Sequence, residues 1–344
     1  MIPPDLSIVI PIYNRGPVVR YTFDSVRRAA AGLKIETIVV DDGSTPPAAE
    51  NLRSLGIEPT KLIRQENRGL LFARLAGLAA ASGRYVLFLD SDDLVSSDKI
   101  TAQVSAMDRS GADVSYTDTA RTTLTGDYDQ LALQVDAPLP ATNEAADFYL
   151  TVQPAPHSPI FRRTYLDPIV ATACFPPSPL YNPVAEIWFY HVAAPQPAHV
   201  EYVPGPRAII GQHPETRLTN HWEKLGIASL AVMEAFARAC PADTPGGRRA
   251  RQLAGEKAFR AWRALPWDFS PEFTDRLLGV WRRLTAETCT PALGGTGYQW
   301  LARVLGPVGA ARLLRRLRHH RYEAIRTLDD ATLDNLLRAL PPPG

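Results

Sequence analysis

Short apolar runs alternate with stretches of helical period over the first 120 residues of the chain. Apolar and β-branched runs predict buried strands at residues 6–12, 35–40, 61–64, 85–89 and 113–116. Apolar positions three and four residues apart predict helices at residues 17–32, 48–55, 69–81 and 97–107. Strands and helices that alternate at this spacing form right-handed βαβ units. The pattern therefore predicts an α/β fold with a doubly wound, mostly parallel sheet.

The pattern changes twice after residue 120. Prolines are dense between residues 137 and 206, which favours short elements: a helix at 184–194 and strands at 200–203 and 207–210. From about residue 222 the period is helical, and helices are predicted at residues 227–240, 248–264, 272–288, 298–304, 308–327 and 330–339. We therefore expect an α/β domain at residues 1–220 and an α-helical carboxyl-terminal region at 221–344.

Polar residues follow three of the predicted strands directly. They are Tyr13 to Arg15, Asp41 to Ser44 and Asp90 to Asp93. The carboxyl ends of parallel strands share one edge of a sheet, and ligands of open α/β sheets bind at that edge. We therefore expect the three clusters to form one ligand site.

The last cluster contains three carboxylates within four residues, Asp90, Asp92 and Asp93. Carboxylates this close repel one another unless a cation lies between them. A divalent metal is the simplest such cation, and Asp-x-Asp suits Mg²⁺ or Mn²⁺ that completes its shell with water and nucleotide phosphates. The alternative is that Asp92 and Asp93 only cap the next helix.

Composition narrows the class of protein. A chain of 344 residues, 45% hydrophobic and 21% charged, can form a sizeable core with a second domain or an extension. A net charge of +1 gives no overall attraction to nucleic acid or membrane. Three cysteines without CxxC spacing fit neither a disulfide framework nor a zinc site, so we expect a cytoplasmic location. We also expect no secretory signal and no transmembrane helix.

Four motifs occur in order along the first 120 residues. They are Ser7 to Arg15 (SIVIPIYNR), Val39 to Thr45 (VVDDGST), Asn67 to Gly69 followed by Ala73-Arg74, and Gly83 to Asp93 (GRYVLFLDSDD). Together they resemble the family 2 glycosyltransferases of the GT-A fold, closely over the first 120 residues and loosely over the next hundred. The resemblance implies a Rossmann-like nucleotide-sugar-binding half at residues 1–120 and an acceptor-binding half at 121–220.

The resemblance also implies roles for the matching residues. Pro11 and Tyr13 match positions that hold the nucleotide base, and Asp42 matches the carboxylate that binds base or ribose. The residues expected to bind the nucleotide sugar are Pro11, Tyr13, Arg15, Asp42, Arg74, Asp90 and Ser91. The residues expected to hold Mn²⁺ or Mg²⁺ are Asp92, Asp93 and His213. For His213 a surface-loop histidine is the alternative.

Direct displacement of the donor's leaving group requires a base that accepts the proton of the acceptor hydroxyl. The family has an Asp for this purpose, often in Glu-Asp-Trp, about a hundred residues after the Asp-x-Asp motif. Ile187 stands at the expected Asp position here, and Glu186 is the carboxylate beside it. We expect Glu186 to be the base, against the alternative that it only caps or solvates its helix; Asp167 and Glu201 are the nearest other carboxylates.

The implied function is metal-dependent, inverting transfer of a sugar from a nucleoside-diphosphate sugar, most simply a UDP-sugar. The acceptor would be a glycan or a lipid-linked hydroxyl in polysaccharide, glycolipid or other glycoconjugate synthesis. One alternative is a nucleotidyltransferase, which would require a Gly-rich phosphate loop after its first strand, whereas Tyr13 to Pro17 contains one glycine. Another is a nucleotide-sugar-binding protein without catalysis, which Ile187 leaves open.

An arginine-rich segment lies near the carboxyl terminus. On a helical wheel Leu313, Leu314 and Leu317 share one side, while Arg312, Arg315 and Arg316 spread over the rest. Such a helix predicts peripheral contact with the inner face of the membrane. The alternative is that the leucines pack inside the helical region and the arginines are solvated.

Overall fold

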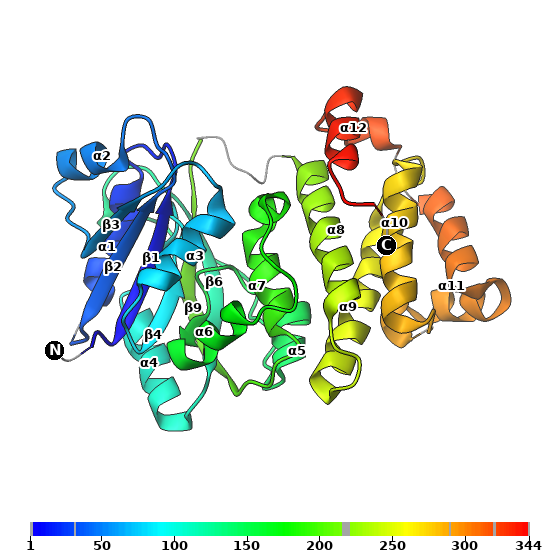
Figure 1. The fold of residues 1–344 in the computed structure, drawn as a ribbon, viewed down its shortest axis with the longest axis horizontal. Helices are drawn as coiled ribbons and strands as arrows, with labels where there is room; N and C mark the ends of the chain where they lie inside the picture. Colours follow the sequence, from blue (N-terminus) through cyan, green and yellow to red (C-terminus); the bar gives the residue numbers. More distant parts are fainter. Residues whose placement is uncertain (1–2, 31, 215–220, 289, 319–320, 343–344) are drawn as a thin grey trace. The chain divides into compact units, whose positions relative to one another are not determined.

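The computed structural model describes residues 3–30, 32–214, 221–288, 290–318 and 321–342 (Figure 1). The chain forms two compact units, Met1–Ala173 with Pro197–Glu215, and Cys174–Gln196 with Thr216–Gly344. This division differs from the predicted boundary near residue 220, because Cys174–Gln196 belongs with the carboxyl-terminal helices. The assignment of residues 1–120 and 121–220 to donor and acceptor stays a prediction.

The first unit is built on one mixed sheet. Within the described residues its strands are β1 (Leu6–Ile12), β2 (Ile35–Asp41), β3 (Lys61–Arg64), β4 (Tyr85–Phe88), β5 (Leu94–Val95), β6 (Val114–Thr123), β7 (Gln134–Val135), β8 (Ile160–Arg162) and β9 (Val200–Gln212). Their order is β3-β2-β1-β4-β8-β6-β9-β5, with β7 paired to β6. The long ladders are parallel, and the antiparallel pairings of β4, β5, β6 and β7 are short. The predicted mostly parallel α/β sheet is confirmed.

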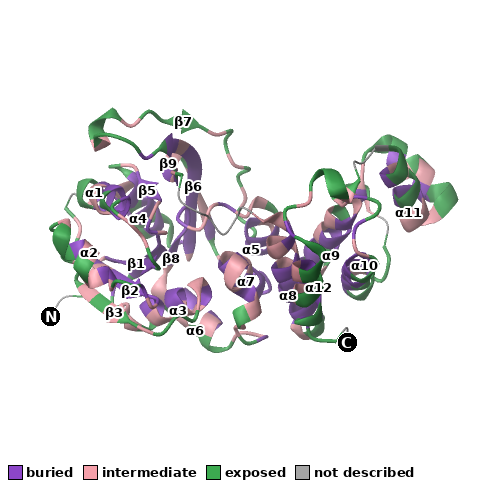
Figure 2. Ribbon diagram, turned by 90° about the horizontal axis from the view of Figure 1, so that it is seen from above, coloured by how far each residue is buried: buried purple, intermediate pink, exposed green. Residues whose placement is uncertain are grey.

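Helices cover both faces of this sheet. They are α1 (Val19–Ala29), α2 (Ala48–Ser54), α3 (Leu70–Ala80), α4 (Lys99–Ser110), α5 (Ala145–Asp147) and α6 (Arg163–Ala171). In Figure 2, α1 and α4 lie on one side of the strands and α3 on the other. Ile8 and Ile10 pack in the core with α1 and α4, whereas Val9 meets α3 so closely that a Cβ on Gly77 would lie 2.2 Å from it. Two-sided burial explains the continuous apolar run from Ile8 to Ile12 in β1.

The strands predicted at 200–203 and 207–210 are instead one long strand, β9, paired in parallel with β6. The Pro204-Gly205-Pro206 interruption is accommodated as a register irregularity opposite Asp118. Asp118 accepts hydrogen bonds from Gly205 N–H at 2.7 Å and from the Tyr202 hydroxyl at 2.7 Å. The local pattern could not show this continuity, because Asp118, which stabilises the irregularity, comes 87 residues before Gly205 in the chain.

The second unit is helical, as predicted. Its helices are α7 (Ala185–Ala193), α8 (Trp222–Ala239), α9 (Pro245–Ala264), α10 (Pro271–Thr285), α11 (Thr296–Arg318) and α12 (Asp330–Arg338). Trp262 and Trp281 pack on Phe259 in its core. The helices predicted at 298–304 and 308–327 are both present, as the two helical segments of α11 on either side of Gly306, whose φ of +71° and ψ of 162° are not helical; the second segment ends at Arg318. No helix of the described residues has the length and apolar content needed to cross a membrane.

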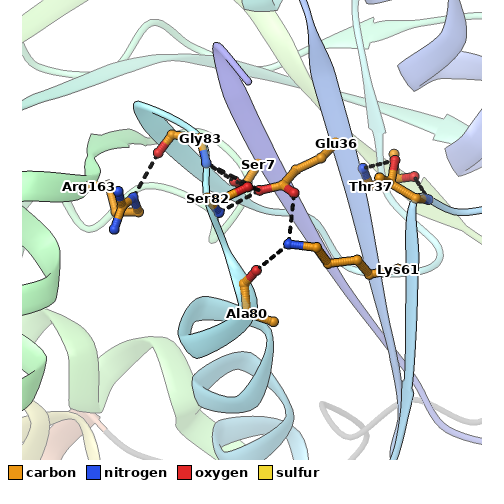
Figure 3. Close-up of polar contacts among 9 residues, drawn as sticks. Ser7, Glu36, Thr37, Lys61, Ala80, Ser82, Gly83 and Arg163 are labelled. Carbon is orange, nitrogen blue, oxygen red and sulfur yellow. Dashed lines mark hydrogen bonds and ion pairs between the residues drawn. The ribbon is translucent and has the colours of Figure 1, made fainter. Parts of the chain in front are cut away.

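A buried carboxylate joins the amino-terminal ends of four parallel strands (Figure 3). Glu36 of β2 accepts hydrogen bonds from the Ser7 hydroxyl of β1 and from Ser82 and Gly83, which precede β4. Lys61 of β3 lies 3.0 Å from its other oxygen. Burial raises the pKa of Glu36, but these hydrogen bonds outweigh burial and lower the pKa to about 2.

Replacing Glu36 by Gln should lower the free energy of unfolding at pH 7 by roughly 3 kcal/mol, the equivalent of the pKa shift. The folded-state pKa is depressed, so this stabilisation is complete above the ordinary pKa of 4.5 and is lost as pH falls toward about 2. Urea unfolding at pH 7 and at pH 3 should therefore show a smaller difference between variant and wild type at pH 3. The exposed Glu58→Gln is the control; equal effects of the two substitutions would refute the role of Glu36.

Candidate functional site

The three predicted polar clusters do lie at one edge of the sheet. β1, β2 and β4 are parallel neighbours, so the residues that follow them project from the same carboxyl edge. Pro11 is buried in β1 opposite Val40, and Tyr13, just beyond the strand, is 52% exposed. An exposed ring next to a buried strand end is available to stack on a planar ligand.

Asn14 connects the first loop to the second. Its backbone N–H donates to the Ser44 hydroxyl at 3.0 Å, and its side-chain oxygen accepts from Thr45 N–H at 2.8 Å. Asn14 adopts φ +46°, a left-handed conformation that Asn tolerates better than most residues. The motif contained Asn14, but the sequence did not single it out as a site residue.

Asp42 is buried and holds the loop that precedes α3. Its carboxylate accepts hydrogen bonds from the Gln65 side chain at 2.7 Å, Arg68 N–H at 2.9 Å and Gly69 N–H at 2.8 Å. The adjacent Gly43 has φ +82°, and a Cβ there would lie 2.8 Å from the backbone nitrogen of Asn67. These contacts give Asp42 a structural task; its contact with base or ribose stays a prediction.

Asp90 is paired with a buried arginine. Arg74, 1% exposed on α3, donates to its carboxylate at 2.7 Å. The Asp90 side chain is still 27% exposed, so it can also meet a ligand, whereas Ser91 is buried. The predicted residues Arg74 and Asp90 therefore lie together, and the arginine orients the carboxylate.

Asp92 lies beside an arginine and a histidine. Its Oδ2 is 3.2 Å from Nη2 of Arg15 and 2.8 Å from Nε2 of His213. Arg15 Nη1 also lies 3.3 Å from the same His213 nitrogen. The His213 side chain is only 3% exposed, so the alternative of a surface-loop histidine is wrong. Three predicted residues from three parts of the chain thus converge.

Asp93 is engaged on both sides within the protein. One oxygen accepts from Gly211 N–H at 3.0 Å and the other lies 3.0 Å from Nδ1 of His157. His157 is fully buried and was not predicted, because an isolated histidine among prolines gives no local signal. Asp93 is tied to a backbone N–H and to a fully buried histidine, whereas the Asp92 carboxylate faces the side chains of an arginine and a histidine, so Asp92 is the better candidate of the two for a metal.

A buried lysine supports the segment that carries His157. Lys99 of α4 donates to the carbonyl of Ser158 at 2.7 Å, and Gln103 donates to the same oxygen at 3.1 Å. Burial lowers the pKa of Lys99 well below its ordinary value, and the charge of Arg207 lowers it further. This polar network fixes the backbone next to His157.

The pairing of β5 with β9 explains how His213 reaches Asp92. Leu94 and Val95, directly after Asp93, pair with Ile209 and Ala208 of β9. Gly211 then passes so near the Asp90–Asp93 turn that a Cβ on it would lie 2.0 Å from the backbone oxygen of Asp92. Only glycine permits this close approach. The approach places His213, two residues later, next to Asp92.

The pair Asp92 and His213 fits a divalent ion. Neighbouring ligands of an octahedral ion with bonds of about 2.1 Å lie about 3.0 Å apart, and the two side-chain atoms are separated by 2.8 Å. The described residues contain no group of three His, Cys, Asp or Glu side chains placed to bind a metal. Water and a diphosphate would therefore have to supply the other ligands, and Arg15 would lie next to them.

Glu186 lies in the first turn of α7, in the second unit. The other two carboxylates considered belong to the first unit: Asp167 of α6 forms an ion pair with Arg163, and Glu201 lies in β9. The role of Glu186 as catalytic base stays a prediction.

Sequence comparison identifies the family to which the amino-terminal part of the chain belongs. Residues 7–169 match the family described as Glycosyl transferase family 2. These residues belong to that family. The glycosyltransferase domain resembles the minor teichoic acid biosynthesis protein GgaA of Bacillus subtilis, with 41% identity over 97 residues, 26% of this chain and 22% of GgaA. It also resembles the succinoglycan biosynthesis protein ExoO of Rhizobium meliloti, with 33% identity over 112 residues, 32% of each chain.

The match is therefore to a part of these proteins, since the chain spans between about a fifth and a third of their length. Structural similarity extends further along the chain. Residues 1–349 of S. aureus TarS in complex with UDP-GlcNAc align with a TM-score of 0.64 at 15% identity, over 94% of this chain and 93% of that chain. This likeness shows that the two chains share a fold.

Replacing Gly211 by Ala should destabilise the protein by roughly 2 kcal/mol, because the added methyl group meets backbone that cannot rotate away. Urea unfolding measures the change. Gly279→Ala on α10 is the matched control, since nothing lies within 4 Å of its Cβ position. A Gly211→Ala protein as stable as wild type would show that the close approach to Asp92 is not needed.

Proposed function

We propose that this protein is a metal-dependent, inverting glycosyltransferase that transfers a sugar from a nucleoside-diphosphate sugar to an acceptor hydroxyl. The convergence of Asp92, His213 and Arg15 at the carboxyl edge of a family 2 domain carries the proposal. The UDP-GlcNAc complex of the structurally similar TarS supports a UDP-sugar as donor. The names of GgaA and ExoO support a cell-surface polysaccharide or related glycoconjugate as product.

The chemistry required at this edge is stabilisation of a leaving diphosphate. Bound Mn²⁺ or Mg²⁺, held by Asp92 and His213, would supply Lewis-acid stabilisation of that negative charge. Arg15 presents a second positive charge at the same place and would contact the phosphates. Asp90, oriented by Arg74, would accept a hydrogen bond from the ribose, and the exposed Tyr13 ring would pack on the base.

Replacing Asp92 by Asn should abolish metal-dependent binding of UDP, because one anionic ligand of the metal is lost while the side chain keeps its shape. Calorimetric titration of UDP with and without Mn²⁺ measures the effect. Asp127→Asn, at an exposed position, is the control. Unchanged affinity of the Asp92 variant for UDP with Mn²⁺ would refute the metal site.

Glu186 is the proposed base. Glu186→Gln should lower turnover by roughly 10²–10⁴-fold while the affinity for donor stays the same, because only proton transfer is removed. Asp167→Asn is the comparison, since Asp167 is the next candidate and already pairs with Arg163. Wild-type turnover of the Glu186 variant together with a loss in the Asp167 variant would transfer the role to Asp167.

Two other functions are separated by the same measurements. A nucleotidyltransferase would release diphosphate from a nucleoside triphosphate, and the family match of residues 7–169 favours sugar transfer over that reaction. A binding protein without catalysis would take up UDP-sugar and Mn²⁺ but give neither transfer nor hydrolysis of the donor. Incubation of purified protein with a panel of nucleotide sugars distinguishes all three.

A further inference from the structure

Helix α11 presents its charged and apolar side chains in an unexpected way. Arg315 is turned inward and is 6% exposed; it donates to the carbonyls of Leu265 at 3.2 Å and Pro266 at 2.6 Å. Its guanidinium lies over the Trp262 ring, 4.9 Å from the centroid. Leu313 and Leu317, by contrast, are 43% and 72% exposed. The alternative that the leucines pack inside and the arginines are solvated is therefore wrong for these three residues.

The small residues of the inner side explain this inversion. Ala310 and Ala311 are fully buried, one turn before Leu314 and Arg315. Alanine side chains fill little of the space on the inner side of the helix. The long aliphatic stem of Arg315 fills that space, and its guanidinium donates hydrogen bonds to backbone carbonyls. Leu313 and Leu317 are left on the exposed side of the helix.

Exposed apolar side chains occur in both helical segments of α11, before and after Gly306, and Figure 2 colours α11 as a mixture of exposed, intermediate and buried residues. We call them, with the exposed arginines between them, the outer face of α11. It consists of Trp300, Val304, Leu305, Leu313 and Leu317, together with Arg303, Arg312 and Arg316. Trp300 and Val304 are 67% and 69% exposed. Large apolar residues gathered at such exposure mark a contact surface.

The charge of the helix indicates what the surface contacts. Residues 296–318 contain no Asp or Glu, so every charged group on the outer face is an arginine. The same face of a second copy would bring arginines against arginines, which disfavours a symmetric contact between copies. An anionic surface with an apolar layer beneath it satisfies both kinds of residue. A bilayer with anionic headgroups is such a surface.

We propose that the outer face of α11 docks on an anionic lipid bilayer. Trp300 and the leucines enter the boundary between headgroups and acyl chains, and Arg303, Arg312 and Arg316 contact the headgroup phosphates. The helix lies on the bilayer and does not span it, in keeping with its length and its arginines. The inference goes beyond the proposed sugar transfer and does not depend on it.

Sedimentation of the purified chain with phosphatidylserine-containing vesicles tests the proposal. We expect binding at low salt, weaker binding at physiological salt, and none to vesicles of phosphatidylcholine alone. The double variant R312E/R316E should lower the partition coefficient at least about 30-fold, and L313S/L317S about 10-fold.

The matched control is R53E/L62S in the first unit. It removes an equally exposed leucine, since Leu62 and Leu313 are both 43% exposed, and reverses one exposed arginine. Its binding should equal that of wild type, and thermal unfolding checks that all variants are folded.

Absence of binding to anionic vesicles at low salt would overturn the proposal, as would equal loss in the control variant. Analytical ultracentrifugation without vesicles tests whether a second copy of the chain binds to the outer face instead. Self-association that L313S/L317S abolishes, while vesicle binding is unaffected, would assign the outer face to a second copy of the chain instead.

Discussion

Carboxylates at the carboxyl edge of a buried sheet must each be given cations or hydrogen-bond donors, and this constraint assembles the site. Asp41 accepts from the backbone of Ser44 and Ala48 and pairs with Arg64. The carboxylates after β4 take their partners from α3, from the loop after β1, from the end of β9 and from the segment before β8. Burying an unpaired charge would cost several kcal/mol. The surrounding loops therefore supply the cations and hydrogen-bond donors that the carboxylates need.

The neighbouring residues Asp92 and Asp93 have different partners: Asp93 holds the turn in place, and Asp92 faces the candidate site. Asp93 ties the turn to β9 through Gly211 N–H and to the buried His157. Asp92 is left facing Arg15 and His213. One carboxylate thus secures the frame in which the other presents an oxygen, and a frame held on both sides keeps that oxygen ready for a ligand without rearrangement.

The opposite edge of the same strands is purely structural. Glu36 gathers hydroxyl, backbone and ammonium donors from three other segments, and its pKa of about 2 keeps it charged at any physiological pH. A buried charge is tolerated there because its partners surround it. The second unit uses a buried arginine in the same way, with carbonyls and the Trp262 ring around Arg315. Buried charges in both units therefore define structure through satisfied contacts.

The sequence by itself determined the order of strands and helices in the first 120 residues, the helical second region and the edge on which the acids gather. These follow from local period and from the rule that parallel strands end together, which need no knowledge of distant residues. The resemblance to the family also pointed to Arg15, Arg74 and His213 as candidate site residues before their contacts were known. Only the tertiary structure decided which acid each of them meets.

The tertiary structure also revealed the position of His157, the contacts of Asp93 with Gly211 and His157, the continuity of β9 and the inward orientation of Arg315. Each of these depends on groups far apart in the chain: Asp93 and Gly211 are 118 residues apart, and Arg315 and Pro266 are 49 apart. A periodic pattern shows which side of an element is apolar, but not whether a long cation finds carbonyls and an aromatic ring on the inner side. Burial of a charge is decided by its partners, and partners are assembled only when the chain folds.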